Sequence, residues 1–408
     1  MNYIKSLKIK SFFSIKNEIE INFLAHQYTS SHYQDRVFSL KNSFFNKTIS
    51  FYGANASGKT SILKVIIVIA AVINNDRKDF LPTSLKNIYS SDKTRLTIDF
   101  VIDNKEYKYE IVLKANNSGY NTSIIDEKLY LENKVIFDRK KKVINLHNLT
   151  ENQKQMKEIE ELFKKIIFSN LNKNISLFND FEKFDNTHIL KKIRKFFKSI
   201  LETTNIEQSY TTTFGINIED ELKLAVNIVE DGKIKKFLID FLSSINIDIS
   251  DIKVDFEKKQ GAIVGIEKIY IYHKINNKKI LEYRFESDGT KQLLKFLLYF
   301  YNAHKNKSVL VIDEFDSVIH PKIIPYLINL LQRYNIQTLY TTHNIYNLKL
   351  LYADEIFFIK KDEQHNTTIC SPKDYDFIEG FENFLSLYEN DYLCNMPKIP
   401  SKLKDIKW

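Results

Sequence analysis

The sequence predicts an α/β protein built on a largely parallel sheet, with antiparallel strands near the N-terminus and helices in the middle. Short apolar strands alternate with helices in the first and last parts of the chain, which is typical of a buried parallel sheet. Apolar residues at helical spacing dominate the middle. We therefore expect residues 1–150 and 215–408 to form one discontinuous domain, and residues 151–214 to form a helical insertion.

The N-terminal antiparallel part is predicted from alternating segments. Residues 3–24 alternate and are rich in Ile and Phe, so we expect two or three strands there. Residues 95–138 contain two further alternating pairs, with turns at Asp103-Asn104 and Glu132-Asn133. These segments are typical of antiparallel hairpins.

The parallel sheet is predicted from strands in both outer parts of the chain. Residues 47–53 are expected to form a short apolar strand, and further strands are expected at 262–274, 278–287, 308–316, 337–344 and 354–361. Helices are expected between them, at 289–304 and 321–334.

Composition narrows the class of protein. The chain has 408 residues, 43% of them hydrophobic and 27% charged, which fits a folded globular protein and argues against long disorder. Its net charge of +9 permits contact with nucleic acid, although a generally basic surface explains the same number.

The cysteines and the hydropathy of the chain indicate the cellular compartment of the protein. The two cysteines, Cys370 and Cys394, show no CxxC spacing, so we expect neither a zinc site nor a disulfide framework, and a reducing cytoplasm is the expected compartment. The most apolar run, residues 61–73, is too short to span a bilayer and contains Lys64. We expect a buried helix there and no membrane association.

The stretch "GANASGKT", residues 53–60, stands between the predicted strand 47–53 and the apolar helix. Its pattern, G-x-x-x-x-G-K-[ST], wraps backbone N–H groups around phosphate oxygens at a helix N-terminus. Gly53 and Gly58 permit the close approach, Lys59 reaches the outer phosphates, and Thr60 offers a hydroxyl to Mg²⁺. The chain has only nine glycines, and two of them stand at the positions that the pattern requires, which argues against a chance match. We call residues 53–60 the phosphate loop.

Two acidic residues follow the predicted strand at 308–312. Asp313 and Glu314 stand at its carboxyl end, where ligands bind in open α/β sheets. Asp313 can hold Mg²⁺, and Glu314 can polarise an attacking water. A solvated acidic turn is the alternative, but its pairing with the phosphate loop favours a site for nucleotide hydrolysis.

Two further motifs carry candidate residues. "TTHN", residues 341–344, ends another apolar strand and places His343 where it can sense the outer phosphate. "ESDGTKQLL", residues 286–294, precedes a helix, and Ser287 and Gly289 make a second anion site at its N-terminus. A plain helix cap by Ser287 or Asp288 is the alternative.

These motifs, in this order, resemble those of ABC/SMC-type ATPases, and among them the RecF/OLD-like stand-alone ATPases found in bacterial phage-defence systems. The resembling stretches are residues 10–23, the Walker A phosphate loop, the signature at 286–294, Walker B with the downstream His320-Pro321, the switch residue His343 and the C-terminal segment. The family's Ser-Gly-Gly is Ser-Asp-Gly here, and Phe13 stands where the family often has arginine. Gln153 and Gln155 are weak candidates for the family's lobe-linking glutamine.

The resemblance implies an ABC-type ATPase head of two lobes that hydrolyses ATP with Mg²⁺ in a homodimer, or a higher even oligomer, that sandwiches the nucleotide. Glu314 is the implied base and His343 the phosphate switch. Thr60 and Asp313 hold the metal, and Ser287 and Gly289 act on ATP held by the partner. The implied ATP-binding residues are Gly53, Asn55, Ala56, Ser57, Gly58, Lys59, Thr60 and Ser61.

The motifs leave three functions open. The first is a defence ATPase that senses a phage component and controls a separately encoded nuclease or toxin. We expect no Toprim nuclease domain, since about sixty residues follow His343. The second is a RecF-like ATPase of DNA repair or DNA binding. The third is a scaffold that binds ATP and barely hydrolyses it, which the intact Glu314 disfavours.

Two basic clusters bear on the choice between the first two functions. They are "DRKKK", residues 138–142, and "KKIRKFFK", residues 191–198. In the second cluster, helical spacing turns Ile193, Phe196 and Phe197 toward a core and leaves the basic residues outside. These basic residues are Lys191, Lys192, Arg194, Lys195 and Lys198. Such a face can contact DNA phosphates, but a simply solvated face is the more common meaning of the pattern.

Overall fold

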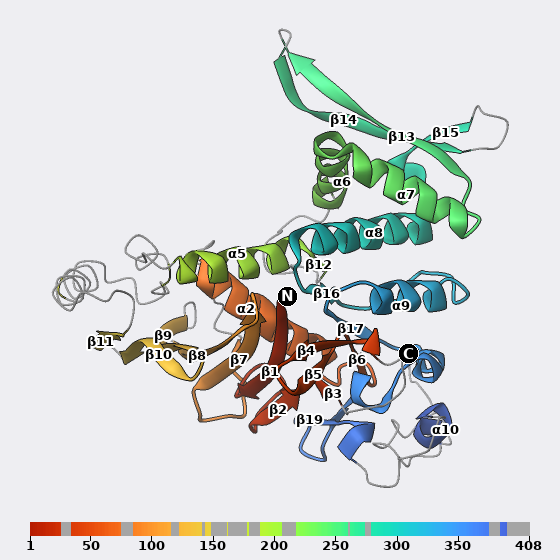
Figure 1. The fold of residues 1–408 in the computed structure, drawn as a ribbon. Coiled ribbons are helices and arrows are strands. Elements are labelled where there is room, and N and C mark those ends of the chain that lie inside the picture. The colour runs from red at the N-terminus through yellow and green to blue at the C-terminus, as the bar shows by residue number, and fades with distance from the viewer. Residues whose placement is uncertain are drawn as a thin grey trace, which may run out of the picture.

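The computed structural model describes residues 1–25, 34–74, 85–115, 122–140, 143–147, 161, 178, 188–205, 218–259, 262–273, 279–374 and 384–389. Within them the chain forms a mixed α/β fold with a six-stranded and a seven-stranded sheet and two small three-stranded sheets (Figure 1). This confirms the predicted α/β class with N-terminal antiparallel strands.

The six-stranded sheet is the predicted parallel sheet. In spatial order its strands are β12 (Thr204–Asn205), β16 (Leu310–Ile312), β17 (Thr338–Thr342), β6 (Thr48–Tyr52), β18 (Ile356–Lys361) and β19 (Thr367–Cys370). All neighbours from β12 to β18 pair in parallel, and only β19 runs antiparallel, against β18. The carboxyl ends of β6, β16 and β17 therefore meet at one edge, which is where ligands bind in such sheets.

The seven-stranded sheet is antiparallel and comes mainly from the N-terminal part. Its order is β11 (Val143–Leu146), β10 (Lys134–Lys140), β9 (Thr122–Leu131), β8 (Lys105–Ala115), β7 (Thr94–Ile102), β1 (Tyr3–Lys10) and β2 (Ile19–Asn22). Both predicted hairpins are confirmed, and Asp103, Asn104, Glu132 and Asn133 all have positive φ, as tight two-residue turns require. A small sheet of β3 (Leu24–Ala25), β5 (Ser43–Asn46) and β4 (Val37–Leu40) lies beside it.

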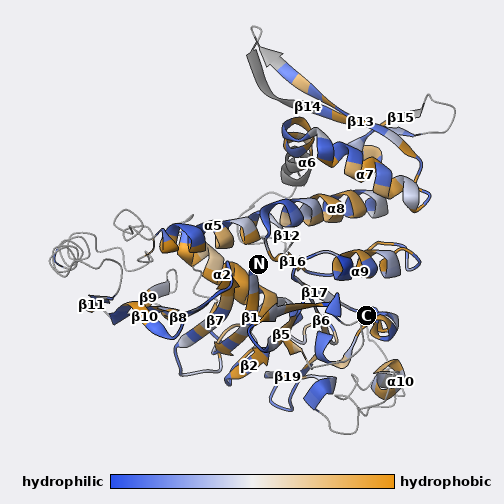
Figure 2. Ribbon diagram, in the orientation of Figure 1, coloured by the Kyte–Doolittle hydropathy of each residue, from blue (hydrophilic) through white to orange (hydrophobic). Residues whose placement is uncertain are grey.

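The apolar run after the phosphate loop is a buried helix, as expected. α2 (Lys59–Asn74) shares one hydrophobic core with strands β1, β6 and β7 and with α5 (Ile189–Glu202). Figure 2 shows α2 as almost continuously hydrophobic, whereas α5 is hydrophobic only in part. No described helix is long and apolar enough to span a membrane.

The expected helical insertion, residues 151–214, is described at 161, 178 and 188–205 only, and the rest lies outside the described residues. The described part belongs to the main core. Ile193, Phe197 and Ile200 of α5 pack in the core around α2, and β12 joins the six-stranded sheet. The limits of an insertion therefore remain a prediction.

One element of the prediction was wrong. We expected strands at 262–274 and 278–287 to return to the main sheet, but they belong to a separate antiparallel sheet of β13 (Ile249–Lys259), β14 (Ala262–His273) and β15 (Lys279–Glu282). The isoleucines Ile252, Ile269 and Ile271 are buried on one face, so the segment alternates as an antiparallel strand does. This sheet, α6 (Ile218–Glu230) and α7 (Gly232–Ser244) stand over α8 (Asp288–Asn306), away from the seven-stranded sheet (Figure 1).

The remaining described elements complete the C-terminal part. They are the 3₁₀ turns η3 (Tyr283–Phe285), η4 (Ile345–Leu350), η5 (Ala353–Glu355) and η6 (Pro372–Asp374), and the helices α9 (Ile324–Arg333) and α10 (Phe384–Glu389). Cys370 on β19 takes part in a disulfide bond, although no disulfide framework was expected, and Cys394 lies outside the described residues.

A buried glutamine ties the two large sheets together. Gln337, fully buried just before β17, accepts a hydrogen bond from Ile4 N at 2.7 Å and donates one to Ile4 O at 2.8 Å. It also donates to Asn46 O at 3.2 Å. The carboxamide thus bonds to β1 as a strand neighbour would, and it fixes the N-terminal strand against the parallel sheet.

Candidate functional site

The phosphate loop has the backbone that its two glycines predict. A Cβ on Gly53 would strike the carbonyl oxygen of Ile359, and a Cβ on Gly58 would strike the side chains of Thr367 and Ser14. Gly58 also has φ +111°, in the region that L side chains rarely adopt. The loop is thus closely packed on its outer side, and any side chain at these two positions would displace it.

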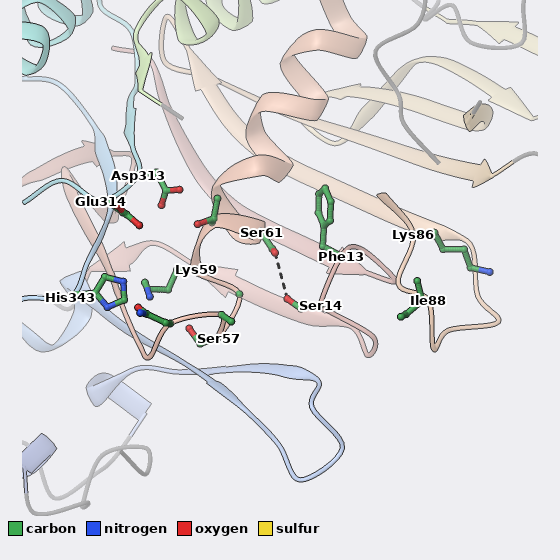
Figure 3. Close-up of a pocket in the computed structure, with 14 residues that line it drawn as sticks. Phe13, Ser14, Ser57, Lys59, Ser61, Lys86, Ile88, Asp313, Glu314 and His343 are labelled. Atoms are coloured by element: carbon green, nitrogen blue, oxygen red, sulfur yellow. Dashed lines mark hydrogen bonds between the residues drawn. The ribbon is translucent and has the colours of Figure 1, made fainter. Parts of the chain in front are cut away.

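Lys59 is the first residue of α2 and lies in the centre of the site (Figure 3). Its Nζ donates to Gly53 O at 2.8 Å and to Ala54 O at 3.0 Å, so the ammonium stays close to the loop. Burial lowers its pKa, while Asp313, Glu314 and Asp316 raise it. A cation held by loop carbonyl oxygens beside the start of a helix, where backbone N–H groups are unpaired, is suited to phosphate.

Asp313 and Glu314 follow β16, and Thr341 of the neighbouring β17 holds both. Thr341 Oγ1 donates to Asp313 Oδ1 at 2.5 Å and accepts from Glu314 N at 2.7 Å. Thr341 is fully buried, whereas Asp313 and Glu314 face the pocket. Glu314 has φ +50°, an unusual conformation for this residue type, and strained backbone of this kind gathers at functional sites. Thr341 belongs to the "TTHN" motif, but the motif did not predict its role as a clamp.

His343 follows the same strand, β17, and lies beside Lys59 and Glu314 in Figure 3. Burial lowers its pKa, and the positive charge of Lys59 lowers it further. The ring is therefore neutral at pH 7, with one nitrogen that donates and one that accepts.

These residues line one open pocket of about 590 Å³. Its lining includes Asn55, Ala56, Ser57, Gly58, Lys59, Thr60, Ser61, Asp313, Glu314 and His343. Gly53 does not line it and acts through close packing instead. The hydroxyl of Ser57 is buried in this lining and has no hydrogen-bond partner among the described residues, as expected of a group that faces a polar ligand.

The oxygen ligands in the pocket fit Mg²⁺. They do not fit a metal ion that is coordinated by protein side chains alone. Thr60 and Asp313 supply a hydroxyl and a carboxylate, the hard oxygen ligands that Mg²⁺ prefers. No group of three or more His, Cys, Asp or Glu residues suited to a metal occurs in the described residues. Mg²⁺ is typically held by one or two carboxylates together with substrate phosphates and water, which matches this sparse set.

The far end of the pocket has four lining residues that the motifs did not predict: Phe13, Ser14, Lys86 and Ile88. The segment that carries Lys86 and Ile88 is tied to the turn at Phe13. Phe13 N donates to Leu85 O at 2.8 Å, and Asn87 Nδ2 donates to Phe13 O at 2.7 Å. Phe13, the residue in place of the family's arginine, thus contributes an aromatic ring to the pocket rather than a charge. Lys86 and Ile88 belong to no motif, so sequence carried no signal for them.

Ser287 and Gly289 do not join this pocket. Ser287 is the N-cap of α8, and its Oγ accepts from Thr290 N at 3.1 Å. Gly289 is needed by packing, since a Cβ there would approach Val318 O to 2.9 Å. The helix cap that the sequence allows as the alternative therefore exists, and Ser287 remains exposed beside it. If Ser287 and Gly289 contact a nucleotide, it is not one that is bound in this pocket of the same chain.

A strand, a glycine-containing phosphate loop and a buried helix, with acidic residues on the adjacent strand, define a P-loop ATPase domain. The chain belongs to the family described as "AAA domain, putative AbiEii toxin, Type IV TA system", whose model matches residues 49–348.

Comparison with solved structures found heads of SMC proteins. One is the Smc head domain with an extended coiled coil bound to the C-terminal domain of ScpA, from Pyrococcus furiosus, with TM-score 0.49, 14% identity, and coverage of 93% of this chain and 99% of that chain. Another is the SMC head domain from Thermotoga maritima, with TM-score 0.40, 14% identity, and coverage of 90% and 98%. A search of curated proteins by sequence found no match.

Proposed function

We propose that the protein binds ATP with Mg²⁺ and hydrolyses it to ADP and phosphate in the pocket of the phosphate loop. The observation that carries this proposal is the convergence of Lys59, Asp313, Glu314 and His343, from separate segments of the chain, on one pocket. Membership of an ATPase family supports it.

In the proposed reaction each residue has a defined role. Lys59 and the loop N–H groups bind the phosphates, and Thr60 and Asp313 hold the Mg²⁺, which neutralises charge on the phosphate oxygens. Glu314 accepts a hydrogen bond from the attacking water and orients it. His343, neutral because of its lowered pKa, donates a hydrogen bond toward the outer phosphate without adding charge.

We further propose that two copies close on each other, and that Ser287 and Gly289 of one copy contact ATP held by the other. The exposure of Ser287 at the start of α8 supports this, because a helix start attracts phosphate. Two large apolar side chains near the signature are also exposed, Phe285 at 65% and Val318 at 64%. Exposed apolar side chains of this kind suit a protein interface. Higher even oligomers are compatible with the same contact.

The test is Glu314→Gln. We expect the variant to bind ATP, to lose hydrolysis by at least about 100-fold, and to accumulate as an ATP-dependent dimer in light scattering. Lys59→Ala, which removes the phosphate contact, is the matched control and should remain monomeric. An unchanged slow hydrolysis in Glu314→Gln would favour the scaffold function instead.

For biological role we propose the sensor or regulator of an anti-phage system in the cytoplasm, acting on a separately encoded effector. The family description, which names a putative toxin and a toxin–antitoxin system, supports a role in such a pair. In a plaque assay with the neighbouring gene present, we expect Glu314→Gln to abolish protection. Protection that persists without an intact site would exclude this role for the ATPase.

DNA binding is a second candidate, favoured by the surface of α5. Lys191, Lys195 and Lys198 are exposed along this helix, and none of them forms an ion pair with another described residue. Lys192, on the same helix, pairs with Asp103. A row of lysines without acidic partners among the described residues fits a phosphate backbone.

The test reverses these three charges, with the exposed Lys233→Glu on α7 as control. If the lysines bind phosphates, the slope of log K against log salt should become shallower by about 0.9 for each phosphate that is no longer neutralised. A binding curve unaffected by salt, or no binding in the wild type, would exclude this function.

A further inference from the structure

Thr367, the first residue of β19, connects three segments that are distant in sequence. Its Oγ1 lies 2.8 Å from Ser57 O in the phosphate loop and 2.7 Å from Ser14 Oγ in the N-terminal turn. Its backbone N also donates to Ser14 O at 3.0 Å. Only 2% of the residue is exposed, so these contacts are shielded from water.

Thr367 is the donor in both of these side-chain hydrogen bonds. Ser57 O is a carbonyl and only accepts, so the hydroxyl of Thr367 donates to it. The same hydroxyl donates to Ser14 Oγ, so its one proton is shared between the two acceptors. Ser61 Oγ lies 3.5 Å from Ser14 Oγ, in a weaker contact in which either hydroxyl can donate (Figure 3). Thr367 thus links the N-terminal turn to one peptide group of the phosphate loop.

That peptide group joins Ser57 to Gly58. In a planar trans peptide the C=O and the following N–H point in opposite directions. Thr367 holds Ser57 O on the outer side of the loop, so the Gly58 N–H is turned to the inner side. This N–H forms no hydrogen bond with a described residue, and Gly58 lines the pocket.

Because Gly58 is a glycine, the Ser57–Gly58 peptide can flip easily, which would exchange the directions of its C=O and N–H groups. Gly58 has φ +111° and no Cβ, so the residue itself resists rotation of the peptide only weakly. The side chain of Thr367 occupies the place where a Cβ of Gly58 would be. The conformation is therefore maintained by the neighbour, through one hydrogen bond and one packing contact.

We propose that Thr367 is a positioning residue for nucleotide binding: its hydroxyl fixes the Ser57–Gly58 peptide so that the Gly58 N–H faces the phosphates. This inference rests on the proposed function, because it assigns the inward N–H to the phosphates of ATP. It adds a residue on the last strand of the sheet, outside every sequence motif, to the phosphate site.

The test compares Thr367→Val, which keeps the shape and removes the hydroxyl, with Thr367→Ser, which keeps the hydroxyl. Thr368→Val is the control, since Thr368 Oγ1 makes only a 3.5 Å contact with Lys360 O. Calorimetric dissociation constants would be measured for ATP and for inorganic tripolyphosphate. We expect Thr367→Val to weaken both by about 10-fold or more, because the hydrogen bond from the Gly58 N–H to a charged phosphate is no longer formed. Thr367→Ser should stay within about 3-fold of the wild type, and Thr368→Val should be unchanged.

Each other outcome is decisive. Equal affinities in Thr367→Val and the wild type would overturn the inference while leaving the proposed ATPase intact. Equal weakening in Thr367→Ser would show that the methyl group, and not the hydroxyl, matters, which also overturns it. A wild type that binds neither ligand would refute the proposed function, and the inference with it. Thermal unfolding of each variant without ligand separates misfolding from impaired binding.

Discussion

Removal of the hydroxyl of Thr341 should lower both the stability of the protein and its rate of ATP hydrolysis. It bonds to the carboxylate of Asp313 and to the backbone N–H of Glu314, at 2.5 and 2.7 Å. Thr341→Val replaces the hydroxyl by a methyl group of the same size, so the core stays filled and only the two hydrogen bonds are removed.

The magnitude follows from burial and charge. Thr341 is fully buried, so valine leaves the two partners to find water at the pocket surface or to remain unpaired. Removal of a bond to a charged group and an unsatisfied donor each cost about 1–3 kcal/mol, and partial solvation of Asp313 reduces the sum. We expect the free energy of unfolding to fall by about 2 kcal/mol. Removal of a residue that orients a metal ligand typically lowers activity by about 10- to 100-fold.

The assay pairs urea unfolding with steady-state ATP hydrolysis, and the strand itself supplies the control. Thr338 is fully buried on the same strand, but its hydroxyl has no hydrogen-bond partner among the described residues. Thr338→Val should therefore leave stability unchanged or raise it, and leave hydrolysis unchanged. Equal changes in stability and hydrolysis for the two substitutions would refute the reasoning. They would show that the effect of valine in β17 does not depend on the hydrogen bonds that are lost.

Three further predictions concern pH and backbone. Burial raises the pKa of Glu355 from 4.5 to about 7, so the folded chain binds more protons than the unfolded chain in this range; stability should fall as pH rises from about 4.5 to 7, and Glu355→Gln should flatten that slope in urea titrations. The pKa of His343 is lowered, so stability should depend on pH in the opposite direction and fall as pH drops below 6.5. The fall should be smaller in His343→Gln, and the same loss of stability at low pH in both proteins would contradict this. Gly58→Ala should abolish ATP binding in calorimetry, whereas Gly232→Ala, which meets no atom within 4 Å, should leave binding intact and stability unchanged or slightly higher.

Local patterns explain which parts of the fold could be predicted. The hairpin turns at Asp103-Asn104 and Glu132-Asn133 and the buried helix α2 follow from short-range periodicity, and all were confirmed. The placement of β14 and β15 did not follow, because an apolar alternating strand looks the same whichever sheet it joins. Register and partner are decided by tertiary packing, which a single sequence does not contain.

The same division holds for the site. The phosphate loop, Asp313, Glu314 and His343 were predicted from motifs because their chemistry requires those residue types at those positions, and the structure brings them to one pocket. Thr367 and Lys86 were not, since each reaches the site through folding from a segment with no pattern of its own. A threonine that orients a peptide has no distinguishing neighbour in sequence.

The long-range contact between Ser14 and Thr367 has a consequence for synthesis of the protein. These two residues are 353 positions apart, and Ile4 and Gln337 are 333 apart. A nascent chain therefore exposes its complete phosphate-binding sequence long before the ribosome has produced the residues that support it. Contacts of such separation form late and slowly. Under the proposed function, ATP therefore becomes a ligand only after β19 has been made, and partly made copies stay out of the proposed closed pair.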